Sequence, residues 1–267
     1  MDVRDQLWSG AGPFYTDPII RELYAVLRDG KGTHADAYQF AQRTAEISAE
    51  ALKRAFGTAE GAELEGLVRE LTAPVLTDGH ELVNAACKQV QEALNEEAGI
   101  HIAAQDAELD EDRLSGLVHE VARRETGPEA AAKAEELGEN FLMHTVDESI
   151  RANADFQHEA GLTPTIEREA EAGCCAWCSG LAGSYRYPEE TQGTEVFGRH
   201  RFCRCTVTFH SDKRRQDVWS KRSWEEGREE RIAAAERDKR LTSDAEKSRM
   251  EQRKASSKNT GGLLFRG

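Results

Sequence analysis

The sequence predicts a mainly α protein: an elongated helical N-terminal region, a small cysteine-rich α+β module and a charged C-terminal helix. Up to about residue 160, apolar residues recur at intervals of three and four between helix caps and breakers. From Leu162 the pattern changes to short alternating segments separated by glycines, which is typical of strands and turns. Aromatic residues make up only 7% of the 267 residues, which favours long helices with thin cores over one large globule.

Caps and breakers divide the N-terminal region into six expected helices. The first begins at Asp17, because an N-cap Asp followed by Pro18 is a start signal, and it ends before Gly30. Thr33 caps the second helix, which ends at Gly57. The others are expected near 59–71 and stopping before Pro74, near 82–98, from about residue 110, and near 128–158. Their apolar stripes are narrow, which favours packing against other chains.

The module that follows is expected to contain four short strands. They correspond to TPTIEREAEA (163–172), SYRY (184–187), EVF (195–197) and RCTVTF (204–209). From about residue 212 the sequence again has a charged, helical pattern up to Met250, followed by an end typical of a flexible terminus. The predicted regions are therefore 1–160, 161–211 and 212–267.

Charge is distributed unevenly along the chain, which has a net charge of −14. Residues 211–267 contain 16 Lys and Arg against 11 Asp and Glu, a net charge of +5, so residues 1–210 carry −19. An acidic body repels nucleic acid, whereas a basic tail can contact it weakly. No apolar run approaches the roughly 20 residues of a membrane span, and the first residues lack a secretion signal, so we expect a reducing cytoplasm and no membrane.

Five of the six cysteines fall between residues 174 and 205. Cys175 and Cys178 form a CxxC pair, and His200, Cys203 and Cys205 form a second group about two dozen residues later. Two such groups can close a tetrahedron of ligands around Zn²⁺. A reducing compartment disfavours disulfides, and thiolates are soft ligands, so the sequence predicts a structural zinc site.

Six side chains compete for four ligand positions. The preferred set is Cys175, Cys178, Cys203 and Cys205, because the last two share one face of the expected strand. His200 is a substitute ligand or a residue that supports the ligands. Cys174 is adjacent to Cys175, so the two side chains point differently and one of them is not expected to bind.

Three alternative roles for the cysteine cluster fit the sequence less well. The thiols could simply be buried, as Cys87 is expected to be on its helix. A catalytic cysteine with His200 as its base would need an acidic residue to orient the histidine, and none stands beside it. A thioredoxin-like CxxC site fits poorly, because Trp177 lies inside the pair and a glycine-rich turn follows.

Three segments carry a resemblance to a known family: EAGCCAWCSGLAGSYRYPEE, EVFGRHRFCRCTVTF and SDKRRQDVWSKRSW. Over about residues 164–224 the chain resembles the phage minor head proteins of the Mu protein F-like group. The matching positions are Trp177, Leu181, Ala182, Gly183, Tyr185, Arg199, His200, Cys203, Arg204 and Cys205. The chain departs from the pattern at Gly198, where many relatives have a basic residue, and at the additional Cys174.

The resemblance implies a structural component of a tailed-phage head. We expect no enzymatic activity, because the roughly 55 residues of charged helix and tail after the module are too few for an appended enzyme domain. The resemblance also implies association with the portal protein and other head proteins during assembly, packaging or ejection, and location in the virion and in the host cytoplasm during assembly. It also allows a homo-oligomer around the portal. We expect zinc to staple the α+β module, since a segment of roughly 60 residues with few large apolar side chains buries too little surface to fold alone.

A nucleic-acid-binding module is the alternative function, because basic and aromatic residues alternate in and after the module. The residues concerned are Arg186, Arg199, Arg201, Arg204, Lys213, Arg214, Arg215, Trp219, Lys221, Arg222 and Trp224. We favour the simpler interpretation that Arg204 and its neighbours pair with acidic residues of the body.

Overall fold

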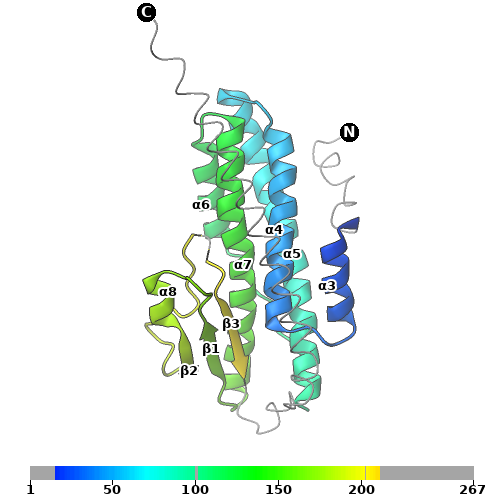
Figure 1. The fold of residues 1–267 in the computed structure, drawn as a ribbon, viewed down its shortest axis with the longest axis vertical. Helices are drawn as coiled ribbons and strands as arrows, with labels where there is room; N and C mark the ends of the chain where they lie inside the picture. The colour runs from blue at the N-terminus through cyan, green and yellow to red at the C-terminus, as the bar shows by residue number, and fades with distance from the viewer. Residues whose placement is uncertain (1–15, 100–101, 202, 211–267) are drawn as a thin grey trace, which may run out of the picture. The chain divides into compact units, whose positions relative to one another are not determined.

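A computed structural model describes residues 16–99, 102–201 and 203–210, and the predicted C-terminal helix lies outside them. The described part is mainly helical, with one small sheet, as the sequence predicts. The long helices are α3 (Pro18–Arg28), α4 (His34–Phe56), α5 (Gly61–Glu97), α6 (Glu111–Ala122) and α7 (Gly127–Glu159), shown in Figure 1. None of the helices in these residues is long and apolar enough to cross a membrane.

Side-chain caps fix the starts of the first two helices, as predicted. The Asp17 carboxylate accepts hydrogen bonds from the backbone N–H groups of Ile19 and Ile20, both at 3.0 Å. Thr33 and Asp36 form a reciprocal capping box at the start of α4. These bonds satisfy N–H groups that have no partner within the helix.

The predicted break at Pro74 is wrong, because α5 continues through this residue from Gly61 to Glu97. A proline inside a helix removes one hydrogen bond and costs about 3 kcal/mol. On both sides of it, Leu71, Val75 and Leu76 are almost completely buried in the core. Burying each such side chain contributes about 1.5–3 kcal/mol, so their combined burial outweighs the cost of the proline.

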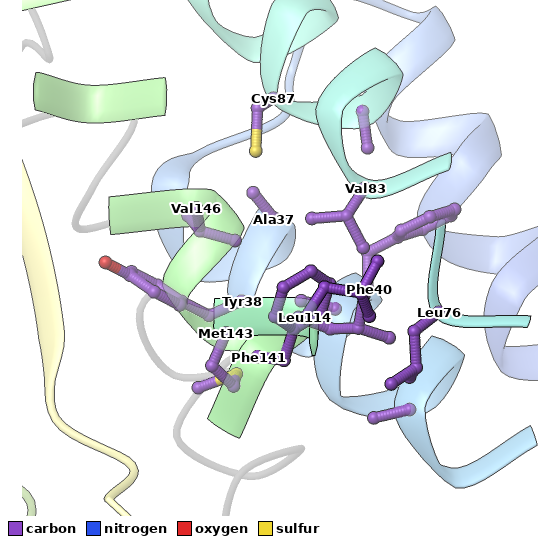
Figure 2. Packing of buried hydrophobic residues seen from close by; sticks show 14 of the residues in the cluster. Ala37, Tyr38, Phe40, Leu76, Val83, Cys87, Leu114, Phe141, Met143 and Val146 are labelled. Atoms are coloured by element: carbon purple, nitrogen blue, oxygen red, sulfur yellow. The ribbon is translucent and has the colours of Figure 1, made fainter. Parts of the chain in front are cut away.

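The core of the helical region lies mainly between α4, α5 and α7. Figure 2 shows side chains from these helices converging, with Phe40 from α4, Val83 from α5 and Phe141 from α7 among them. Cys87 lies in this core, as predicted, and burial raises the pKa of its thiol to about 12. The Tyr38 hydroxyl points out of the apolar cluster, which leaves it available for polar partners.

The sheet has three antiparallel strands in the order β2-β1-β3. They are β1 (Thr165–Glu169), β2 (Gly183–Arg186) and β3 (Thr206–His210), and the short helix α8 (Ala176–Leu181) lies between β1 and β2 in the sequence. The third predicted strand, 195–197, does not form. Its backbone is used in other ways, since the Gly198 N–H closes a turn onto the Glu195 carbonyl at 2.7 Å and the Val196 carbonyl accepts a bond from the Arg168 side chain.

The sheet packs against α4 and α7 through β3 (Figure 1). Ile166, Val207 and Phe209 are buried and belong to the same hydrophobic core as the helices. Ile166 lies opposite Phe209 in the register of the sheet. The buried face of β1 carries Ile166 and, two residues further along, Arg168, so the apolar part of this face is followed by a charged one.

Candidate metal centre

All five predicted ligands come together in the structure. Cys175 is the N-cap of α8 and Cys178 lies within it, whereas the other three precede β3. Two trios have donor atoms within 4.8 Å of one another: the first is Cys175, Cys178 and His200, and the second is Cys178, Cys203 and Cys205. None of the cysteines forms a disulfide. The cluster could therefore hold a metal ion.

Within the two trios, several pairs of donor atoms lie slightly closer together than the ligands of a tetrahedral zinc ion. The Cys178 Sγ atom lies 3.0 Å from His200 Nε2 and 3.5 Å from Cys203 Sγ, and Cys175 Sγ lies 3.3 Å from His200 Nε2. Sulfur ligands about 2.3 Å from a tetrahedral zinc ion are separated by about 3.8 Å. Small side-chain movements would therefore bring these donors to the distances of a metal site.

His200 has the orientation of a ligand. Its Nδ1 atom lies 2.7 Å from the Arg201 carbonyl oxygen, which can only accept, so Nδ1 carries the proton and donates. In the neutral ring, the Nε2 lone pair then faces the sulfur atoms of Cys175 and Cys178. Metal-binding histidines almost always donate their other ring nitrogen in this way. The edge of the ring also packs against Trp177, with ring centres 5.6 Å apart.

Local structure gives the sulfur atoms different acidities. The backbone N–H of Cys178 donates to Cys175 Sγ, and this bond, with one from Trp177, lowers the pKa of Cys175. Burial raises the pKa of Cys178 to about 12. Burial also opposes ionisation of Cys205, but bonds from the Glu171 backbone and the neighbouring thiols outweigh it and lower the pKa. A metal ion must displace the remaining protons, so its affinity falls with decreasing pH.

Arg168 lies beside the cluster and is a site residue that the cysteine spacing does not reveal. It is 1% exposed, and its Nη2 atom lies 3.7 Å from Cys203 Sγ and 3.9 Å from Cys178 Sγ. Its other terminal nitrogen donates to the Val196 carbonyl, and the guanidinium lies 5.8 Å from the centre of the Trp177 ring. The sulfur atoms of Cys178 and Cys203 are therefore among the polar partners of this buried guanidinium.

A second buried charge fixes the loop that carries His200 and Cys203, which we call the ligand loop. Arg199 pairs with Asp147 of α7 through two nitrogens, and both side chains are fully buried. Arg199 also donates to the Cys203 carbonyl at 3.1 Å and stacks 4.8 Å from the Tyr38 ring centre. Burial lowers the pKa of Arg199, but the Asp147 charge outweighs it, so the pKa is raised and Arg199 stays charged.

Tyr38 joins α4 to this pair and to the sheet. Its hydroxyl donates to Asp147 at 2.6 Å and accepts the Val207 N–H at 3.1 Å. Burial first, and then the Asp147 charge, raises the pKa of Tyr38 well above its usual range, so the hydroxyl keeps its proton. The ion pair therefore connects α4, α7, β3 and the ligand loop.

Further polar contacts join the same loop to α7. Asn140 donates to the His200 carbonyl at 2.9 Å and accepts from Arg113 of α6 at 2.6 Å. Two ion pairs join the loop to α7 as well: Arg201 lies 2.7 Å from Glu136, and Arg204 lies 3.7 Å from Glu139. The prediction that Arg204 and its neighbours pair with acidic residues of the body is confirmed for the arginines at 199, 201 and 204.

Gly198 allows the ligand loop to pack closely. A Cβ atom at this position would lie 2.9 Å from the Glu195 carbonyl oxygen and 3.2 Å from the Trp177 ring. Trp177 itself donates to the Glu195 carboxylate at 3.0 Å. The residue that departs from the family pattern is therefore one that leaves room for the tryptophan beside His200.

No protein-family model, curated protein or solved structure matches the chain.

Proposed function

We propose that the Cys/His cluster holds zinc as a structural centre. The observation that carries this proposal is the burial of the sulfur atoms: Cys178, Cys203 and Cys205 are all buried, and Arg168 packs against two of them. Catalytic zinc sites keep a ligand position open to water or substrate, whereas structural sites are closed. A thiolate-rich set of donors favours zinc over hard cations such as Mg²⁺ or Ca²⁺.

The metal would replace a hydrophobic core that this part of the chain lacks. Around the ligands, the buried apolar cluster consists of Cys178, Cys203 and Cys205, with Ala170 and Cys174 packed against it. Such small side chains bury little apolar surface. Metal–thiolate bonds would supply the stability that holds α8 and the ligand loop on the end of the sheet.

For the chain as a whole, we propose a structural, non-enzymatic role as a minor head protein of a tailed bacteriophage or prophage, associated with the portal. Support comes from the resemblance over residues 164–224. The helical region would provide the docking surface. Large apolar side chains are exposed there on α3, where Ile19 is 48% and Tyr24 51% exposed. Apolar groups of this kind are typical of protein–protein contacts.

Binding to DNA through the module is the less favoured function. Each of the four arginines that suggested it within the described residues pairs with an acid: Arg186 with Glu190, Arg199 with Asp147, Arg201 with Glu136 and Arg204 with Glu139. Paired guanidinium groups have less positive potential to offer to phosphates. The basic residues from 213 onward lie outside the described residues.

Elemental analysis of the purified full-length chain tests the metal proposal. We expect at least one zinc ion per chain, and loss of zinc from Cys178→Ser and Cys203→Ser. The control is Cys87→Ala, which removes a thiol from the helical core and should leave the zinc content unchanged. A correctly folded wild-type chain without metal would overturn the proposal.

Co-purification with the portal protein encoded nearby tests the phage proposal. We expect the full-length chain to bind, and to remain bound at high salt, because a mainly apolar contact is not screened. The double variant Ile19→Asp, Tyr24→Asp should lose binding, whereas the exposed substitution Glu65→Gln should not. If the wild-type chain ignored the portal but bound duplex DNA with a steep salt dependence, the DNA-binding function would replace the proposal.

A further inference from the structure

Two buried thiols of the cluster already lie in contact. The Sγ atoms of Cys178 and Cys203 are 3.5 Å apart, and both side chains are buried. Cys178 belongs to α8, whereas Cys203 belongs to the ligand loop, 25 positions later in the sequence. Sulfur atoms joined in a disulfide lie about 2.05 Å apart, so these two need to approach by only about 1.5 Å. The fold therefore brings together two cysteines that can form a disulfide.

The surroundings of this pair hold both sulfur atoms in place. One terminal nitrogen of Arg168, Nη2, lies 3.9 Å from Cys178 Sγ and 3.7 Å from Cys203 Sγ. The backbone of Cys203 is also fixed, because its carbonyl accepts from Arg199 and its N–H donates to the His200 carbonyl, both at 3.1 Å. These backbone contacts do not involve sulfur, so they persist when the thiols react.

Cys175 links the buried pair to the solvent. It is exposed, and its Sγ atom lies within 4.8 Å of Cys178 Sγ. A dissolved oxidant therefore reaches Cys175 before it reaches the buried thiols, and exposure is one of the properties that make a cysteine susceptible to oxidation. Oxidation can then pass from Cys175 to Cys178, because a CxxC spacing is one at which a disulfide forms.

We propose that the cluster is redox-sensitive: a peroxide oxidises Cys175, and the oxidation passes through Cys178 to form a disulfide between Cys178 and Cys203. Its consequence, release of the metal, rests on the proposed zinc binding. Cys178 belongs to both trios of close donor atoms, so the disulfide removes a ligand from each of them. Thiolates are the form of cysteine that binds metal, and a sulfur atom in a disulfide is no longer a thiolate.

The steps balance with a peroxide as the oxidant. The Cys175 sulfur attacks one oxygen of hydrogen peroxide, the O–O bond breaks, and the thiol proton leaves with the other oxygen as water. The Cys178 sulfur then displaces the hydroxyl group of the sulfenic acid on Cys175, which takes up the Cys178 proton and leaves as a second water. Finally, the Cys203 sulfur attacks Cys178, the bond to Cys175 breaks, and the Cys203 proton passes to Cys175. Two thiols are oxidised and one hydrogen peroxide is reduced to two waters.

The disulfide should come to rest at Cys178 and Cys203 because of the difference in exposure. A bond between Cys175 and Cys178 has one exposed sulfur atom, whereas both sulfur atoms of the other pair are buried. Access is one of the factors that set the rate at which a thiol in solution attacks a disulfide. The buried disulfide is therefore the better protected of the two.

Disulfide mapping of the full-length, zinc-loaded wild-type chain tests the inference without any variant. The chain is treated with hydrogen peroxide, the remaining thiols are blocked, and zinc release is followed with a chelating dye. Chymotrypsin cleaves after Trp177, which separates Cys178 from the two preceding cysteines. Trypsin cleaves after Arg204, which separates Cys203 from Cys205. In the mass spectrum we expect a cross-link between Cys178 and Cys203 that forms as zinc is released and is reversed by dithiothreitol.

The possible failures of the two proposals are distinguishable. A different main cross-link, irreversible oxidation without a cross-link, or retention of zinc with all thiols reduced would overturn the redox inference and leave the zinc site standing. A purified, folded chain without zinc would overturn the structural zinc site. The same mapping of that metal-free chain would then still decide whether Cys178 and Cys203 form the disulfide.

Trapping of the first oxidised residue tests the route. Dimedone, which reacts with sulfenic acids, should label Cys175 and prevent the cross-link. Cys203→Ser should stop at the disulfide between Cys175 and Cys178, and the control Cys87→Ala, which removes a thiol from the helical core, should behave like the wild type. Dimedone on Cys178 or Cys203 with none on Cys175 would contradict entry of the oxidant through Cys175 and overturn the inference.

Discussion

The helical region and the Cys/His module both have a buried interior, but different kinds of side chain fill it. In the helical region, the residues with almost no exposure are mainly apolar, for example Val68, Leu142 and Val146. In the module, the Arg168 and Arg199 side chains are as deeply buried as any leucine, and they lie beside sulfur atoms and carbonyls. Apolar packing is insensitive to chelators and acid, whereas charged and thiolate groups respond to both. The two regions should therefore fail under different conditions.

The Cys/His module depends on the helical region for its stability more than the helical region depends on the module. The sheet has no separate apolar core, because Ile166, Val207 and Phe209 complete the core of the helices. The helices also pack extensively on one another, with α4 against both α7 and α5. Loss of the metal should therefore loosen the module and leave the helices folded. Loss of the buried ion pair between Arg199 and Asp147, which lies where the module packs on the helices, should destabilise both regions.

The largest effect is expected from Asp147→Asn, which leaves the Arg199 guanidinium buried without a counter-charge. Removing one partner of a buried ion pair costs about 3–5 kcal/mol. We expect the free energy of unfolding, measured with urea, to fall by about this amount. The double variant Asp147→Asn, Arg199→Met should lose less than the sum of the single variants, because no charge is left unpaired.

A matched control is the exposed pair Arg69 and Glu65 on α5, whose atoms lie 2.9 Å apart. Glu65→Gln should cost less than about 1 kcal/mol, since water screens this pair. If Asp147→Asn lowered the free energy of unfolding no more than Glu65→Gln does, the packing of the module on the helices would not depend on the buried ion pair.

An effect of opposite sign is expected from Pro74→Ala, which acts on the helical region alone. Alanine restores a backbone N–H inside α5 and removes the clash of the proline ring with the preceding turn. We expect the free energy of unfolding to rise by about 1–3 kcal/mol, with the zinc content unchanged. A loss of stability in urea unfolding would mean that the proline ring contributes packing that alanine cannot replace.

A smaller effect is expected at acid pH from His34, which begins α4 and packs 5.8 Å from the Phe209 ring of β3. Burial, with the nearby His210, lowers the pKa of His34 to about 4. The unfolded chain therefore binds the proton more readily, and stability falls as the pH decreases from about 6.5 towards 4.

Between pH 7 and pH 5 this contribution should amount to about 1–2 kcal/mol. His34→Gln should lose less stability than the wild type over this interval, whereas His119→Gln, on α6, should behave like the wild type. Comparing the three proteins at each pH cancels the contribution of all other groups. If the free energy of unfolding changed equally with pH in His34→Gln and in the wild type, that result would contradict a buried, neutral His34.

Local signals in the sequence are sufficient to predict much of the fold. Asp17 and Thr33 cap helices through bonds to their own neighbours, so a few adjacent residues determine the result. The break expected at Pro74 is wrong because the burial that offsets the cost of the proline comes from other helices, which no local pattern reveals. The strand expected at 195–197 is wrong for a similar reason, since the partner of its Val196 carbonyl, Arg168, lies far away in the sequence.

The candidate site is predictable to the same extent. Cysteine spacing identifies the donors, because ligands of one ion recur at short intervals. Spacing cannot reveal Arg168, although a charged residue two positions after Ile166, on the buried face of an expected strand, is an available signal. The pairing of Arg199 with Asp147 joins residues 52 positions apart, and only the packing of the loop on α7 brings them together.

Hydrogen exchange of the full-length chain, with its metal bound and after removal by a chelator, tests most directly whether metal holds the module on the helices. We expect faster amide exchange after chelation in peptides covering 174–186 and 196–205, and unchanged protection in the buried parts of α4, α5 and α7. Unchanged exchange in the module, or an equal loss of protection in the helices, would contradict this expectation.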